Sequence, residues 1–128
     1  MKERMITVLK VEPHKYPEVV TLKNELRALQ EAVSIGAGST GLIEIVSLDE
    51  ETIVICNEEG KLIGLEPNRR YGHDVFCGVF YVVGQDGEGE LTSISERALA
   101  KYGSLFMQPQ DIDRSEVEAT ILCNIFFY

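Results

Sequence analysis

The feature of this sequence that most restricts its fold is an apolar run over residues 76–84, FCGVFYVVG. No polar position alternates with the apolar ones, and a strand of this kind is typically buried on both faces. The run is less than half as long as the roughly 20 residues that a membrane-spanning helix needs. We therefore expect a strand at the centre of a sheet, in a protein that does not cross a membrane.

Four shorter segments rich in β-branched residues predict further strands. They cover residues 6–11, 42–46, 52–56 and 61–65. The second and third are joined by polar residues that suit a turn, so they should form a hairpin. Residues 66–74 are polar and lack periodicity, which predicts a long loop before the central strand.

Apolar residues at helical spacing predict two helices. The first covers residues 21–33, and its Leu26 and Leu29 should face the sheet. The second starts at residues 93–96, SISE, which fit a capping box with Ser93 as the N-cap. It should end before Pro109, because proline does not continue a helix.

Residues 36–41, GAGSTG, spell the G-x-G-x-x-G pattern of dinucleotide-binding loops. Such a loop follows a strand and opens a helix, whose N-terminus then meets the pyrophosphate. Here the predicted helix precedes the loop and a predicted strand follows it. We therefore interpret the segment as a helix-to-strand connection in which Gly36 ends the helix.

The tail over residues 115–128 fits two structures. Acidic residues at its start and apolar residues at helical spacing favour a helix, but its β-branched and aromatic residues also suit a strand. The helix is slightly favoured. An apolar end at residues 125–128 would leave an exposed patch unless it docks on its own chain or on a partner. We therefore expect a homo-oligomer.

Together these elements predict a two-layer α+β fold, with both helices on one face of a mostly antiparallel sheet. At 128 residues the chain fits a single domain, with a core over about 5–106 and a C-terminal extension over 107–128.

The three cysteines lie in separate apolar stretches, as buried structural thiols do. Two histidines cannot hold a metal ion by themselves, so we expect neither a metal site nor a cofactor.

The charge balance restricts the possible partners. There are 21 acidic and 12 basic residues, a net charge of −9, which repels the phosphate backbone of nucleic acids. No basic run is long enough for an anionic membrane surface. The absence of C-x-x-C pairs and of a signal-like N-terminus fits the cytoplasm. Direct nucleic-acid and membrane binding are therefore disfavoured.

One candidate ligand site lies in the polar loop, at Asn68, Arg69, Arg70, Tyr71 and His73. The arginines could hold a phosphate, the tyrosine ring could stack on a base, and the amide could read a base edge. The structural alternative is that Asn68 builds a turn and Arg69 pairs with a carboxylate across the fold. No residue stands in a nucleophile motif, so catalysis is not expected.

The sequence also resembles a small family of uncharacterised domains found mostly in phages, plasmids and other mobile elements of Gram-positive bacteria. The resemblance covers about residues 5–106 and rests mainly on residues 57–69, NEEGKLIGLEPNR. It also includes VEP at 11–13 and the GVF and VVG segments of the apolar run. The resemblance implies an accessory protein of a mobile element, where small acidic proteins often counter host defences.

Three functions are compatible with these features. The first is a non-catalytic protein that captures a nucleotide-type signalling ligand through the polar loop. The second is an acidic inhibitor that docks on a host defence enzyme such as a nuclease. The third is a nucleotide-processing enzyme. In the first case, replacing Arg69 with alanine should weaken ligand binding and leave the fold intact.

Overall fold

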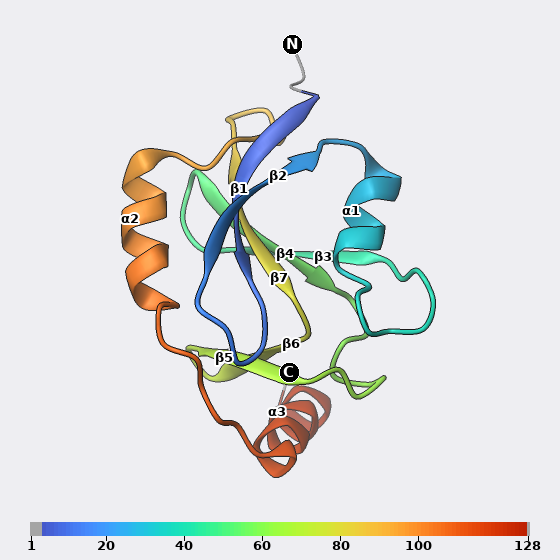
Figure 1. The fold of residues 1–128 in the computed structure, drawn as a ribbon. Helices are drawn as coiled ribbons and strands as arrows, with labels where there is room; N and C mark the ends of the chain where they lie inside the picture. Colours follow the sequence, from blue (N-terminus) through green and yellow to red (C-terminus); the bar gives the residue numbers. More distant parts are fainter. Residues whose placement is uncertain (1–3, 128) are drawn as a thin grey trace.

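The computed structural model describes residues 4–127 (Figure 1). The elements, in chain order, are β1 (Met5–Val11), β2 (Glu18–Lys23), α1 (Leu26–Ala32), β3 (Ile43–Ser47), β4 (Thr52–Asn57), β5 (Pro67–Tyr71), β6 (Asp74–Cys77), β7 (Phe80–Gln85), β8 (Leu91–Thr92), α2 (Glu96–Leu105) and α3 (Arg114–Phe127).

The main sheet has the strand order β2-β1-β7-β4-β3, with β8 added beside β7, and every pairing in it is antiparallel. A second, two-stranded sheet is formed by β5 and β6. The expected α+β class with a mostly antiparallel sheet is therefore confirmed. So are the β3–β4 hairpin and the central position of β7.

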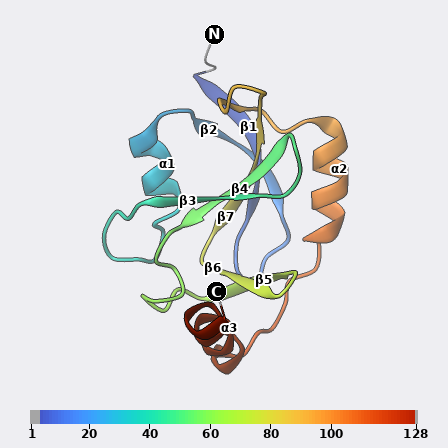
Figure 2. The same cartoon turned by 180° about the vertical axis from the view of Figure 1, so that it is seen from behind.

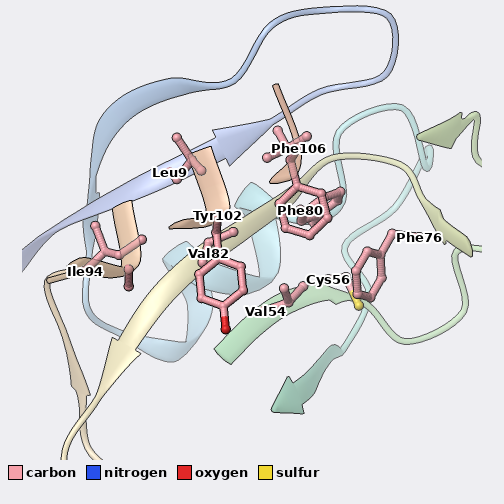
Figure 3. Close-up of a cluster of buried hydrophobic side chains, with 11 residues drawn as sticks. Leu9, Val54, Cys56, Phe76, Phe80, Val82, Ile94, Tyr102 and Phe106 are labelled. Atoms are coloured by element: carbon pink, nitrogen blue, oxygen red, sulfur yellow. The ribbon is translucent and has the colours of Figure 1, made fainter. Parts of the chain in front are cut away.

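The helices do not share one face of the sheet, which corrects the two-layer prediction. The sheet lies between α1 and α2 (Figure 1). Val54 and Val82 face α2, where they pack in one cluster with Tyr102 and Phe106 (Figure 3). Their chain neighbours, such as Ile53, pack on the other face with α1. The physical reason is that β1, β4 and β7 are apolar on both faces, so each face needs a cover.

The helix expected over residues 21–33 is wrong in its first part. Residues 18–23 form β2, which pairs with β1, and α1 begins only at Leu26. Leu29 is buried as predicted, at 4% exposure, whereas Leu26 is 60% exposed. Leu22 fits both a helical and an alternating pattern, and pairing with β1 decides for the strand.

The region from residue 61 to residue 84 also differs from the prediction. Residues 61–64 form a turn, and no strand covers residues 61–65; the expected polar loop is the β5–β6 hairpin. The apolar run is divided into β6 and β7 at Gly78, which has a φ of +80°. A Cβ atom at Gly78 would lie 2.7 Å from the Leu65 side chain, so the corner is closely packed.

The second helix begins two residues later than predicted. Its N-cap is Ser95, whose hydroxyl accepts a hydrogen bond from the amide of Ala98 at 3.1 Å. The Ser93 hydroxyl instead accepts from the amide of Thr7 on β1, at 2.9 Å. Ser93 therefore fastens the chain to the sheet before the helix starts.

The tail is a helix, as slightly favoured from the sequence. Val117 is buried on α3, and Ile121 packs beside it against the β5–β6 sheet.

Cys123 is exposed, contrary to the expectation of three buried thiols. The side chains of residues 126–128, on which the docking expectation partly rested, lie outside what the structure describes. Within residues 4–127, no helix is both long and apolar enough to span a membrane.

Candidate functional site

Four of the residues predicted from the polar loop lie on β5, and the first two of these face the interior. Asn68 and Arg69 are both fully buried. The Asn68 amide nitrogen donates to the carbonyls of Val11 and Gly78, at 2.9 and 2.8 Å. Asn68 therefore ties β5 to the end of β1 and to the corner before β7, and its side chain does not build a turn with its own backbone.

The Arg69 guanidinium binds backbone and amide oxygens. Nε donates to the carbonyl of Phe106 at 3.0 Å, Nη2 to that of Lys15 at 2.7 Å, and Nη1 to Oδ1 of Asn68 at 2.8 Å. No carboxylate among the described residues forms an ion pair with it. Burial accordingly lowers the pKa of Arg69 below its usual value. These contacts join three distant segments, and the structure does not support Asn68 and Arg69 as ligand anchors.

The other predicted residues point elsewhere. Arg70 lies on the opposite side of β5 from Arg69 and binds the Glu116 carboxylate of α3 with two hydrogen bonds, at 2.6 and 2.9 Å. This pairing raises the pKa of Arg70 and lowers that of Glu116. The Tyr71 ring stacks on Phe76 at 5.9 Å. His73 is exposed in the turn between β5 and β6, and with Arg70 it lines a surface pocket of about 270 Å³. Asn68, Arg69 and Tyr71 do not line this pocket, so the five predicted residues are not brought together in one site.

A pocket of about 370 Å³ lies nearby, between the main sheet, the β5–β6 sheet and α3; we call it the α3 pocket. Its size falls within the range of small-ligand sites. Figure 2 shows the side of the molecule on which β3 and β4 approach the β5–β6 hairpin and α3. The lining residues are Glu44, Val46, Cys56, Asn57, Glu58, Gly60, Lys61, Leu62, Asp74, Val75, Phe76, Cys77, Ile121, Asn124 and Ile125.

Carboxylates predominate among the charges of the α3 pocket. Glu44, Glu58 and Asp74 line it together with one ammonium group, Lys61, which is paired with Asp74. Burial raises the pKa of Glu44, the negative charges of Asp74 and Glu58 raise it further, and Lys61 opposes them. The pocket therefore carries an excess of negative charge that one lysine does not neutralise.

Apolar side chains form much of the pocket's remaining lining, and its two thiols are buried. Burial raises the pKa of Cys77, and raises that of Cys56 to about 12. A raised pKa favours the protonated thiol, which disfavours both cysteines as nucleophiles. At the rim, Leu62 and Ile125 are 74% and 64% exposed. The pocket combines negative charge with apolar surface. This combination suits a ligand that has a positively charged group at the end of an apolar chain.

The sequence offered no signal for this pocket. Glu44 and Glu58 looked like ordinary solvated acids, and the lining comes from β3, β4, the turn after β4, β6 and α3. Only the fold brings these segments together. Among the described residues, no group of three or more histidine, cysteine, aspartate or glutamate side chains is arranged to hold a metal ion.

Comparison with known proteins identifies a family. A domain of unknown function, DUF3846, matches residues 6–107. The chain belongs to this family. No curated protein and no solved structure matches the chain significantly. The matched span runs from β1 to the end of α2, so the part of the α3 pocket that α3 contributes lies outside the DUF3846 match.

Proposed function

We propose that this DUF3846 protein is a non-catalytic binding protein, and that its α3 pocket receives cationic side chains of a basic partner protein. The observation that carries the proposal is the charge of the pocket: three carboxylates and one lysine, above an apolar lining. A lysine or arginine side chain has a matching form, with an apolar stem and a charged end. Hydrophobic contact would add affinity, and charge would add specificity.

The same geometry disfavours the capture of a phosphate ligand. Arg69 is buried and Arg70 is paired with Glu116, so neither guanidinium is free to hold a phosphate. The α3 pocket offers only Lys61, and its ammonium is bound to Asp74. A nucleotide would meet an excess of carboxylates there. We therefore favour the acidic-inhibitor hypothesis over nucleotide capture.

The biological setting forms part of the proposal. The resemblance to domains of phages and other mobile elements suggests an accessory protein that counters a host defence. A nuclease is a suitable partner, because its substrate groove is basic and the net charge of this chain is −9. Such a complex would form in the cytoplasm and would weaken steeply with salt.

A binding experiment with small probes tests the proposal. Saturation-transfer NMR would compare capped lysine amide with a 3′,5′-cyclic nucleotide, at low and high salt. We expect the lysine probe to bind, more weakly in salt, and Glu44→Gln to weaken it. The matched control is Glu88→Gln, which removes the same charge from the exposed turn between β7 and β8.

Two results would contradict the proposal. One is lysine-probe binding that is equal in Glu44→Gln and in the wild type, because the cation would then lie outside the pocket. The other is binding of the cyclic nucleotide alone, which would restore the nucleotide-capture hypothesis.

A further inference from the structure

Strand β3 forms one edge of the main sheet, and its hydrogen-bonding pattern shows which backbone groups are free. The register pairs Ile43 with Asn57 and continues regularly to Ser47. Just beyond its two ends, the Glu58 amide donates to Leu42 and the Leu48 amide donates to Thr52. Hydrogen-bonded pairs alternate along an antiparallel ladder. The even-numbered residues of β3 therefore bond to β4.

The odd-numbered residues of β3 consequently point their backbone groups away from β4. These are Ile43, Ile45 and Ser47, and no described residue on that side hydrogen-bonds to their amides or carbonyls. Free groups in such a row can pair with a further strand. The opposite edge strand, β2, has charged residues at both ends, which commonly protect an edge. Strand β3 has none at its ends.

The side chains of β3 alternate between two environments. Glu44 and Val46 line the α3 pocket. Ile43 and Ile45 lie on the other face of the sheet, where Ile45 is 50% exposed. A strand added beside β3 would follow the same alternation. Every second side chain would lie beside the carboxylates of the pocket, and those between would lie beside Ile45.

A second copy of this chain is a poor occupant of this edge. Each copy carries a net charge of −9, and pairing two β3 strands would place both Glu44 side chains on the same face of the joined sheet. A segment with basic residues at alternate positions has complementary charge on the pocket face. Apolar residues between them would cover Ile45.

We infer that β3 binds an extended segment of the partner protein by β-strand addition, with its lysine or arginine side chains directed into the α3 pocket and apolar side chains beside Ile45. This inference rests on the proposed function, and it specifies the class of partner and the mode of binding. Backbone hydrogen bonds to β3 would provide affinity, and the pocket would select the basic positions.

The inference is tested with a capped heptapeptide of alternating lysine and valine. The decisive variant is Ile45→Pro, since proline removes the outward-pointing amide of residue 45 and leaves the bonds to β4 in place. Ile45→Thr is the matched control, because it keeps both the amide and β-branching. Affinity would be measured by NMR titration, and strand addition by amide hydrogen exchange along β3.

We expect the peptide to slow exchange at Ile43, Ile45 and Ser47 and to bind more tightly than capped lysine amide. Ile45→Pro should weaken it about three- to tenfold, the range for one hydrogen bond, relative to Ile45→Thr. A heptapeptide N-methylated at alternate residues cannot donate these backbone hydrogen bonds, so it should bind the wild-type protein no more tightly than capped lysine amide. This comparison tests the inference even if Ile45→Pro is unstable.

Other outcomes separate the inference from the proposed function. If the heptapeptide and its N-methylated form bind equally and neither slows amide exchange along β3, strand addition is wrong. The proposed cation pocket is still supported in that case if Glu44→Gln weakens the binding of capped lysine amide. A glutamate-valine peptide that binds as well as the lysine-valine peptide would overturn the basic selectivity. If neither the heptapeptide nor capped lysine amide binds, both proposals fail.

Discussion

Replacing Arg69 with methionine tests whether this buried guanidinium holds the domain together. Methionine keeps much of the side-chain volume, so the change mainly removes hydrogen bonds and opens little cavity. The bonds lost include those to the Phe106 carbonyl and to Oδ1 of Asn68, both in fully buried residues. The Lys15 carbonyl belongs to an exposed residue and can bind water instead.

The expected loss of stability follows from those two buried acceptors. A buried acceptor left without a donor costs about 1–3 kcal/mol, and the effects of neighbouring groups are not additive. We expect Arg69→Met to lower the free energy of unfolding by about 3–5 kcal/mol, a large share of the roughly 5–15 kcal/mol of a typical domain. Arg69→Lys should be intermediate, because one ammonium group cannot reach all of these acceptors.

Urea unfolding followed by circular dichroism measures this loss. Arg27→Met is the matched control, since the Arg27 side chain on α1 is 86% exposed, and it should unfold like the wild type. A loss below about 1 kcal/mol for Arg69→Met, with an unchanged dependence on urea, would refute the reasoning. Arg69 would then be dispensable for folding, as the ligand-anchor hypothesis requires.

Two further predictions concern the two faces of the sheet. Burial tends to raise the pKa of Asp49, but hydrogen bonds, above all the 2.7 Å bond from the Tyr102 hydroxyl, lower it to about 2. Tyr102→Phe should cost about 1.5–3 kcal/mol at pH 7. This stabilisation is present above pH 3.8 and is lost as the pH falls through about 2. The difference in urea midpoint between the wild type and Tyr102→Phe should therefore shrink in acid. A pH-independent difference would contradict this. On the other face, Leu29→Ala should lower the free energy of urea unfolding by about 2–5 kcal/mol, and Leu26→Ala should lower it much less. Equal losses in the two variants would mean that α1 is misplaced.

The parts of the fold that the sequence predicted correctly are those in which the local pattern allows one structure. The apolar run that became β6 and β7 could only be buried, and the β3–β4 hairpin had β-branched strands around a polar turn. Leu22 was ambiguous, because its spacing fits a helix and its alternation fits a strand. Pairing with β1 decided the outcome, and a pairing partner is not visible locally.

The candidate site was harder to predict, because its residues depend on contacts between distant segments. Polarity made Arg69 look exposed, yet its acceptors at Phe106 and Lys15 lie 37 and 54 positions away. A buried arginine satisfied by carbonyls has no local signature. The acids of the α3 pocket were missed for a similar reason, since Glu44 has the pattern of a solvated surface residue and only the fold places α3 and the β5–β6 sheet beside it.

The most direct test of the central claim is a carbon-13 NMR titration of the Glu44 carboxyl group. In the free protein its midpoint should lie above the usual pKa of glutamate, because the group is partly desolvated beside Asp74 and Glu58. A cation in the α3 pocket stabilises the charged carboxylate, so saturating lysine-valine heptapeptide should lower this pKa. A midpoint that starts at the usual value, or that does not move when the peptide binds, would contradict the account.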